Sequence, residues 1–265
     1  MPKVVALYRY PVKGFTPERC ERITVLPGGR VAGDRVFNFR FADAPVADSV
    51  WCRKYHGVVL VNTPGLARLQ VQFDDQQQRL RIAFEGHVLA DDTLDEAGRQ
   101  RLVDAITGYV LSLAENPLQG QPMHLPLKLV GDGITPRYQD NAAGQVTLHS
   151  RESLASAGAA LGDANLDESR FRHNIVIEGM AAWEEQSWAG GKLRVGNVEF
   201  ETVVPKIRCL ATHANPQSGE RDLDVMQTLV QAFKQQQPTF GVGMLSSAGG
   251  EIRIGDAVAA GDLRA

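Results

Sequence analysis

The sequence predicts a mainly β protein with several helices, that is, an α+β fold. Short apolar runs, each bounded by Gly, Pro, Asp or Asn, recur at spacings of about ten residues, which is typical of antiparallel barrels and sandwiches. Only a few longer stretches repeat apolar residues at the three- and four-residue spacing of a helix. With 265 residues and 43% hydrophobic content, the chain can form one large core or two modest ones.

The N-terminal half is predicted to contain short strands followed by one helix. A helix is expected over residues 96–114, because apolar residues from Leu102 to Leu113 form one stripe. Asn116 and Pro117 end this helix, and residues 116–122 are the candidate linker. The predicted strands span residues 3–10, 23–26, 36–41, 58–61, 69–73 and 80–84. The linker divides the chain into two predicted domains, residues 1–120 and 121–265.

The C-terminal half is predicted to alternate strands with two helices. Ser150 is expected to cap a helix over residues 151–161 that ends at Gly162. A second amphipathic helix is expected over residues 223–236 and is closed by Pro238. The predicted strands span residues 125–130, 146–149, 174–178, 192–195, 198–204, 251–254 and 256–259.

The stretch 200–216 contains the most reactive combination in the chain. An alternating run ends at Pro205, and the lone thiol of Cys209 follows Arg208. A guanidinium lowers the pKa of a neighbouring thiol because it stabilises the thiolate. Cys209 is therefore a metal ligand, a nucleophile or an inert buried cysteine, and the local sequence leaves all three open.

Composition excludes several classes of function. The net charge of −3 gives the molecule no overall bias toward nucleic acid or acidic membranes, although the first 60 residues carry a local excess of basic residues that suits an anion-binding wall. The three cysteines have no metal-site or redox spacing, which favours a reduced, cytoplasmic location. No signal peptide and no apolar run of about 18 residues is found, so no membrane span is expected.

Familiar catalytic motifs do not explain the chain. The six histidines lack zinc-site spacing, and no Rossmann fingerprint, P-loop or nucleophile elbow is present. What remains is a group of cationic and amide residues in predicted turns, where binding groups usually lie. Guanidinium groups suit phosphate, and a thiolate beside them indicates a phosphorylated, sulfur-bound cofactor. The group comprises Lys13, Arg35, Arg53, Arg172, Asn174 and Arg208.

An ordered series of short motifs resembles one family. The series includes the segments YPVK at 10–13, GDR at 33–35, RFRHNIV at 170–176, EQSW at 185–188, RC at 208–209, NPQSG at 215–219 and IGD at 254–256. In this order the chain is similar to MOSC-domain proteins with an N-terminal β-barrel domain, the family of the mitochondrial amidoxime-reducing components. The resemblance covers nearly the whole chain and implies a β-barrel-like N-terminal domain followed by a MOSC β-barrel domain.

The resemblance implies a molybdenum cofactor, that is, molybdopterin with molybdenum. Cys209 would be the metal ligand and His173 a proton donor. The residues expected to bind the pterin and its phosphate are Lys13, Arg35, Arg53, His149, Ser150, Arg172, Asn174 and Arg208. Pyridoxal phosphate binding is a further expectation of the same kind.

The implied activity is reduction of small N-hydroxylated compounds, such as hydroxylamines and amidoximes, to amines. No iron–sulfur or flavin motif is present, so electrons are expected from a separate reductase or iron–sulfur or flavin protein. Two alternatives stay open: sulfur transfer through a persulfide on Cys209, and a non-catalytic carrier of the cofactor. The chain departs from the family at Gly14, at His173 and at Lys206, which bears on substrate and cofactor geometry.

Overall fold

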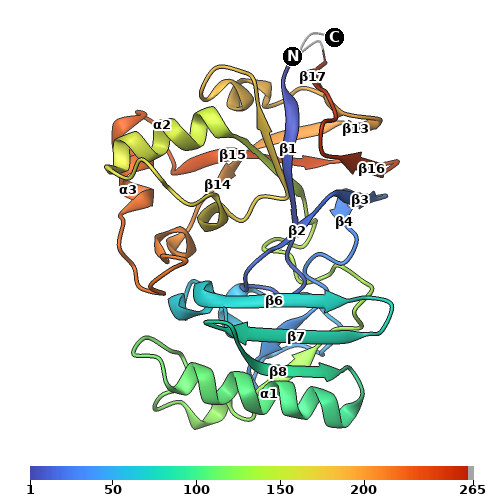
Figure 1. The fold of residues 1–265 in the computed structure, drawn as a ribbon, viewed down its shortest axis with the longest axis vertical. Helices are drawn as coiled ribbons and strands as arrows, with labels where there is room; N and C mark the ends of the chain where they lie inside the picture. Colours follow the sequence, from blue (N-terminus) through green and yellow to red (C-terminus); the bar gives the residue numbers. More distant parts are fainter. Residues whose placement is uncertain (262–265) are drawn as a thin grey trace.

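Three hydrophobic clusters organise residues 1–261, which are the residues that the computed structural model describes. The first gathers mainly side chains between Val12 and Leu129. The second draws strands from both ends of the chain, from Val4 to Val258. Figure 1 shows the two resulting lobes one above the other, with the N-terminus and β17 (Val258–Ala260) at the far end of the second. The predicted mainly β class is confirmed, with three α-helices among the described residues.

The second lobe is built on a six-stranded sheet and two smaller sheets. In the large sheet only β10 and β11 run parallel. Its order is β14 (Thr202–Ile207), β15 (Thr239–Leu245), β10 (Val146–Ser150), β11 (Ile175–Glu178), β1 (Lys3–Arg9) and β2 (Glu18–Cys20). The smaller sheets are β13 (Val198–Phe200), β12 (Leu193–Val195) and β17 (Val258–Ala260), and β16 (Gly250–Arg253), β3 (Arg22–Leu26) and β4 (Arg30–Val31).

Helices α2 (Arg151–Leu161) and α3 (Val225–Ala232) pack beside this sheet and enclose the third cluster. The predicted cap of α2 is confirmed, because the Ser150 hydroxyl accepts a hydrogen bond from the Ser153 amide at 3.1 Å. Gly162 ends the helix with φ +73°, a conformation that costs glycine little. Short 3₁₀ helices connect the strands: η1 (Lys54–His56), η2 (Pro64–Arg68), η3 (Pro122–His124), η4 (Glu168–Phe171), η5 (Glu184–Trp188) and η6 (Leu210–His213).

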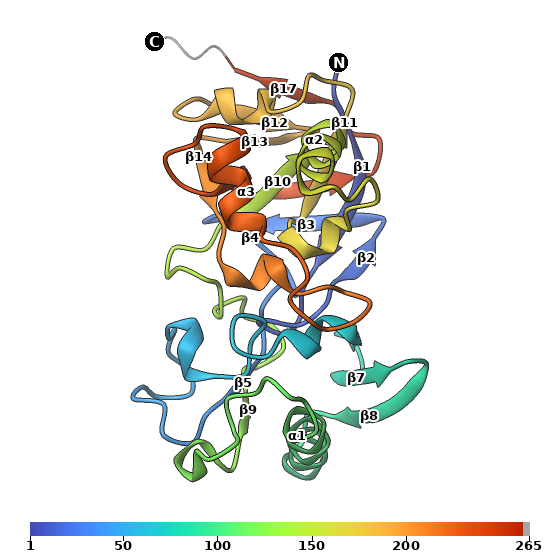
Figure 2. The same ribbon diagram turned by 90° about the vertical axis from the view of Figure 1, so that its left-hand side faces the viewer.

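The first lobe pairs a three-stranded sheet with α1 (Glu96–Leu111), which lies against β8 at the end of the molecule (Figure 2). Alternation predicts the inward face of the first strand correctly, since Leu69, Val71 and Phe73 are buried. Asp95 caps α1 by accepting from the Gly98 amide at 2.8 Å. The strands are β6 (Leu69–Asp74), β7 (Arg79–Phe84) and β8 (His87–Thr93), with β5 (Asn38–Arg40) and β9 (Lys128–Val130) forming a separate pair.

Three expectations about strands are wrong. The single strand expected over residues 198–204 is divided into β13 and β14, which belong to different sheets. Residues 58–61 form a turn, of which residues 58–60 are buried, because the Asn62 side chain binds the Val59 amide and the Gly57 carbonyl, each at 3.0 Å. Pro205 does not end its strand, since β14 continues to Ile207 and pairs Pro205 with Val242. This strand lies at the edge of its sheet, where a missing amide donor is tolerated.

The N-terminal strands belong to the second lobe. The first strand, β1, pairs with β11, and β3 pairs with β16 near the C-terminus. Val4, Leu7 and Ile23 accordingly pack in the second cluster. The boundary at residue 120 stays a prediction, and the chain crosses between the lobes after residue 31 as well as near that boundary.

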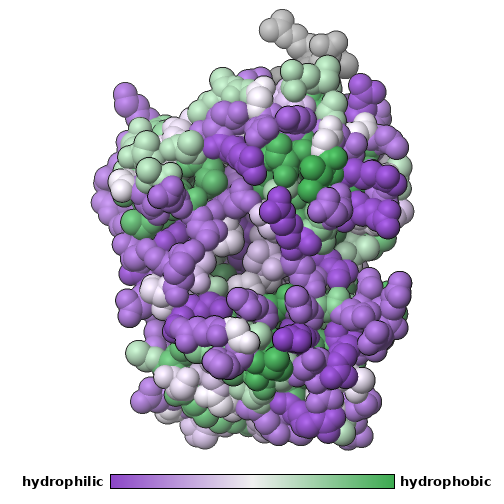
Figure 3. All heavy atoms as spheres, viewed as in Figure 1, coloured by the Kyte–Doolittle hydropathy of each residue, from purple (hydrophilic) through white to green (hydrophobic). Residues whose placement is uncertain are grey.

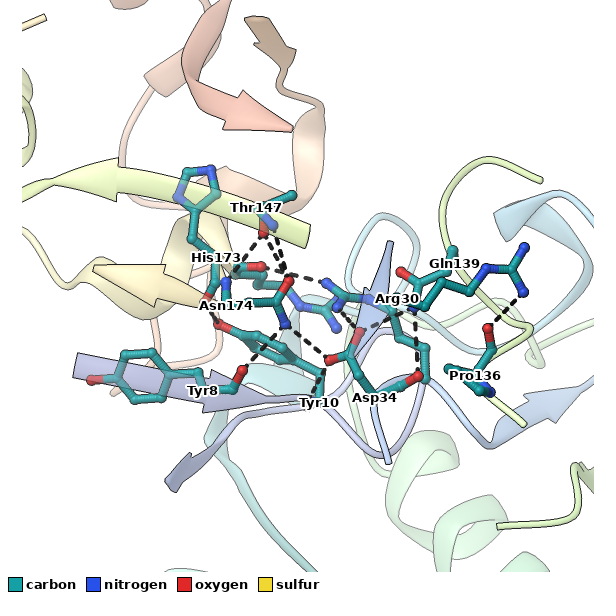
Figure 4. A network of polar contacts seen from close by, with 11 residues as sticks. Tyr8, Tyr10, Arg30, Asp34, Pro136, Gln139, Thr147, His173 and Asn174 are labelled. Atoms are coloured by element: carbon teal, nitrogen blue, oxygen red, sulfur yellow. Dashed lines mark hydrogen bonds and ion pairs between the residues drawn. The ribbon is translucent and has the colours of Figure 1, made fainter. Parts of the chain in front are cut away.

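The carboxylate of Asp34 joins the crossing segments (Figure 4). It is 1% exposed, and one of its oxygens accepts from the Tyr10 amide at 2.8 Å and the Asn174 side chain at 3.2 Å. The other oxygen accepts from the Arg35 guanidinium and from the Gln139 amide group. Asn174 continues the network to Thr147 of β10. Four segments that are distant in sequence are thereby held around one anion.

No helix within residues 1–261 is both long enough and apolar enough to cross a membrane.

Replacing Asp34 by Asn should lower the unfolding free energy by about 3 to 5 kcal/mol, because it leaves a buried guanidinium without its counter-ion. Chemical denaturation monitored by tryptophan fluorescence measures the change. Asp75→Asn is the matched control, since that carboxylate lies 3.4 Å from Arg9 with 60% of its side chain exposed. The control should leave stability nearly unchanged. A loss of similar size in both variants would contradict the special role of Asp34.

Candidate functional site

A pocket at the meeting point of the lobes collects most of the chain's buried cations. The view in Figure 3 shows a hollow between the lobes with mainly hydrophilic residues around it. The pocket is lined by Lys13, Arg35, Lys54, Gln139, Asp140, Gln145, Thr147, Arg170, Arg172, Lys206, Arg208, Cys209 and Thr212, together with apolar residues such as Val59 and Phe171. Of the predicted site residues, the structure brings Lys13, Arg35, Arg172, Arg208 and Cys209 together here.

Lys13 reaches the pocket from the turn after β1. Its side chain is 2% exposed, and its ammonium donates to the Gln139 carbonyl at 3.1 Å and to the Cys52 carbonyl at 3.3 Å. Burial lowers the pKa of Lys13. Gly14 has φ +80°, and a Cβ there would lie 2.6 Å from the Cα of Val59. The glycine at this departure from the family is therefore required by the close packing of Val59.

Arg35 and Arg172 enter from opposite lobes and lie against the same aromatic ring. Their guanidinium carbons lie 4.8 Å and 4.9 Å from the centre of the Tyr10 ring. Both residues have left-handed backbones, with φ of 52° and 55°. Such strain in two non-glycine residues is typical of functional sites.

The two arginines differ in how their charge is balanced. Arg35 is paired with Asp34, whereas the Nε and Nη2 atoms of Arg172 are buried without a hydrogen-bond acceptor among the described residues. Burial, and then the neighbouring Arg35, lower the pKa of Arg172 to about 10. Arg172 thus presents buried donors toward the pocket that an anion could satisfy.

Arg208 and Cys209 follow the end of β14. The register of β14 against β15 shifts between Pro205 and Ile207, and such a bulge re-aims the side chains that follow. Arg208 donates to the Phe171 carbonyl and leaves its Nε without an acceptor among the described residues. Cys209 is partly exposed and lies directly before η6, whose Thr212 binds the Cys209 carbonyl at 3.0 Å.

Several lining residues were not predicted. Lys54 lies beside the Cys209 thiol; burial alone would lower the pKa of Lys54, but the charge of Cys209 raises it above its ordinary value. Asp140 is the carboxylate at the rim: desolvation alone would raise its pKa, but Arg35, Lys13 and Arg172 hold it well below the usual range. Lys54 begins the short η1 helix and Asp140 lies in a loop, and neither belongs to a motif. Only the basic character of residues 1–60 pointed toward Lys54.

The remaining predicted residues do not line the pocket. Arg53 is exposed beside Lys54. Asn174 is fully used in the network of Asp34 and Thr147. Ser150 caps α2 and also contacts Glu185. His149 and His173 lie behind Arg208, with their Nδ1 atoms 2.8 Å apart.

Within residues 1–261, no three His, Cys, Asp or Glu side chains gather where they could hold a metal ion between them.

The comparisons with known families divide the chain in two. Residues 1–103 match the MOSC N-terminal beta barrel domain, and residues 135–259 match the MOSC domain. Relatives include mitochondrial amidoxime reducing component 2 of Bos taurus, 28% identical over 43% of this chain and 36% of the relative. Another is molybdenum cofactor sulfurase of Bos taurus, 32% identical over 30% of this chain and 9% of the relative. The matches thus span well under half the length of these relatives.

Among solved structures, the YUAD protein from Bacillus subtilis aligns over 97% of this chain and 94% of its own, with 10% identity and a TM-score of 0.42. None of these family descriptions or relatives' names supports the expected pyridoxal phosphate binding, and the function proposed below does not include it.

Acidification should destabilise the fold through His149 and His173. Burial lowers the pKa of His149 to about 3 and that of His173 well below its ordinary value. Both imidazoles regain a pKa of about 6.5 on unfolding, so the unfolded state takes up protons first as the pH falls. Each histidine should remove up to about 1.4 kcal/mol of unfolding free energy per pH unit between about pH 6 and pH 4.

Denaturant unfolding across this range measures the slope. The double variant His149→Gln with His173→Gln should show a shallower dependence on pH, whereas His87→Gln, at an exposed position, should keep the wild-type slope. Equal slopes for the wild type and the double variant would show that the pair is not the cause.

Proposed function

The chain is a MOSC-domain protein with a MOSC N-terminal beta barrel domain, and we propose that it is an oxidoreductase that binds the molybdenum cofactor and reduces N-hydroxylated compounds to amines. One observation carries the proposal. A partly exposed thiol stands at the edge of a pocket whose wall contains guanidinium donors without acceptors among the described residues. A thiolate ligand next to a phosphate-binding wall is the donor set that such a cofactor requires.

The residues present fit this group. The unpartnered nitrogens of Arg172 and Arg208 suit phosphate oxygens, and Lys13 and Arg35 add positive charge at the same wall. Cys209 supplies a soft sulfur ligand, and the ammonium of Lys54 lies beside it. Within this arrangement we assign Cys209 as the metal ligand, and Lys13, Arg35, Arg172 and Arg208 as the groups that hold the pterin and its phosphate.

When bound, the cofactor would supply the two electrons and the Lewis-acid metal for cleavage of the N–O bond. The protein would orient the substrate and deliver protons. The apolar residues that line the pocket, among them Leu60, Val61 and Ala211, would contact the carbon skeleton of a small substrate. Electrons would come from a separate reductase or an iron–sulfur or flavin protein.

Lys206 is the best-placed proton donor. It lines the pocket, and its ammonium donates to the Gln145 side chain at 2.9 Å. Burial lowers the pKa of Lys206 to about 8, so Nζ carries a proton at neutral pH and can release it. His173, the donor expected from the sequence, lies outside the lining and is kept neutral by burial. We therefore assign proton delivery to Lys206.

A second candidate is sulfur transfer through a persulfide on Cys209. The partial exposure of this thiol between Lys54 and Arg208 supports it, because reactive cysteines are accessible and lie in electropositive surroundings. A carrier that stores the cofactor without turnover would use the same pocket. Metal analysis separates the sulfur carrier from the other two, and reduction of a hydroxylamine by a chemical electron donor separates enzyme from carrier.

Replacement of Cys209 by Ala should abolish molybdenum retention, because no other thiolate lines the pocket among the described residues. Molybdenum and pterin are measured in protein produced with cofactor supply. Cys20→Ala is the control, since Cys20 lies in β2 outside this pocket, and it should retain wild-type metal content. Unchanged molybdenum in Cys209→Ala would refute the ligand assignment.

The rate of hydroxylamine reduction should fall as the pH rises through about 8, because the protonated form of Lys206 is the donor. In Lys206→Gln this alkaline limb should disappear, and the rate at pH 7 should drop about 100-fold, the lower range for loss of a general acid. Molybdenum content should stay at the wild-type level. A variant that keeps both the limb and the rate would exclude Lys206 as the donor.

A further inference from the structure

His173 and His149 form a buried pair next to Arg208, and neither histidine lines the pocket. Each histidine is 1% exposed, and their Nδ1 atoms lie 2.8 Å apart. Phe240 packs against both rings, with ring centres 5.3 Å from His149 and 5.7 Å from His173. The pair therefore lies in apolar surroundings, and the function proposed above gives it no task.

The hydrogen bonds of the pair have one consistent direction. Nη1 of Arg208 lies 3.5 Å from Nε2 of His173, and a guanidinium can only donate. Nε2 of His173 must then accept, so the proton of this neutral ring is on Nδ1 and is donated to Nδ1 of His149. The proton of His149 is consequently on Nε2.

The far end of this chain faces Glu168. Nε2 of His149 is buried without a hydrogen-bond partner among the described residues, and Oε2 of Glu168 lies 4.0 Å away. The other oxygen of Glu168 accepts from the Tyr8 hydroxyl at 2.5 Å, and 21% of the Glu168 side chain is exposed. The sequence Arg208, His173, His149 and Glu168 thus runs from the pocket wall to the surface.

The glycine at position 241 makes room for the pair. Gly241 has φ +67°, and a Cβ there would lie 2.9 Å from both Cε1 and Nε2 of His173. It would also lie 2.3 Å from the Leu148 carbonyl oxygen. No side chain fits between the Gly241 backbone and the His173 imidazole, so close packing restricts the position of this ring.

We infer that His173 and His149 are positioning residues that hold the Arg208 guanidinium for the anion of the proposed function, through neutral imidazoles that end on Glu168. Arg35 and Arg170 are instead held by the carboxylates of Asp34 and Asp222, which offset their charge. A neutral acceptor orients Arg208 and leaves its charge available. The inference rests on the proposed anion pocket, but the hydrogen-bond order can be measured without it.

The first experiment determines the tautomers of the wild-type chain. Long-range ¹H–¹⁵N spectra of protein labelled with ¹⁵N-histidine should show His173 protonated on Nδ1 and His149 on Nε2 at neutral pH. Single His→Gln variants at the two positions assign the signals. A His173 ring that carries its proton on Nε2, or a charged ring at pH 7, overturns the inference, because either would place a donor against the Arg208 guanidinium.

The second experiment measures anion binding. The full chain, produced in a host that makes no molybdenum cofactor, is titrated with inorganic pyrophosphate by calorimetry. His173→Leu should raise the dissociation constant about tenfold, the effect of one lost hydrogen bond to a charged group. His173→Gln, whose side-chain oxygen can accept from Arg208, should restore binding. His87→Gln is the control at an exposed position.

The outcomes distinguish a failure of the positioning role of the two histidines from a failure of the proposed anion pocket. Equal dissociation constants for the wild type and a folded His173→Leu variant overturn the positioning role while leaving the anion pocket intact. Absence of pyrophosphate binding by the wild type removes the anion pocket and with it the role of the pair. In that case the tautomer spectra still show whether the hydrogen-bond chain itself is formed.

Discussion

One buried carboxylate, that of Asp34, holds together the segments on which the pocket is built. It binds the end of β1, the Arg35 turn, Asn174 before β11 and Gln139 of the loop that precedes β10. Each of these segments also contributes a pocket residue or lies beside one. Because a buried anion is stable only when its donors stay in place, the same network that satisfies Asp34 also fixes the geometry of the cationic wall.

The wall of the pocket brings several positive charges close together, and each arginine side chain is stabilised by different partners. Arg35 and Arg170 have carboxylate partners, Arg172 rests against the Tyr10 ring, and Arg208 is held by neutral acceptors. Buried cations that repel one another are destabilising; the pKa of Arg172 is lowered first by burial and then by the charge of Arg35. A ligand bearing phosphate would relieve this repulsion and satisfy the free guanidinium nitrogens, so binding and folding are thermodynamically coupled at this site.

The parts of the structure that depend on local patterns could be predicted from the sequence, and those that depend on distant contacts could not. The cap at Ser150, the left-handed Gly162 and the inward face of β6 follow from short-range rules. Residues 58–61 looked like a strand because they are apolar, but the side chain of Asn62 supplies their hydrogen bonds. Five of the ten predicted site residues meet in the pocket, whereas the strand β15 and the lining residue Lys54 carry no recognisable pattern.

The pocket, too, depends on contacts between residues that are distant in the sequence. Its cations come from both lobes. Lys13, Arg35 and Lys54 precede the first lobe's sheet, whereas Arg172 follows η4, Lys206 lies in β14 and Arg208 follows β14 in the second lobe. Neither set alone surrounds Cys209. With the cations of one lobe alone, Cys209 would be a reactive thiol at the surface. With the cations of both lobes around it, the same thiol becomes one ligand within a binding site. The functional unit is therefore the contact between the lobes, which the buried Asp34 holds together while the thiol of Cys209 stays partly exposed.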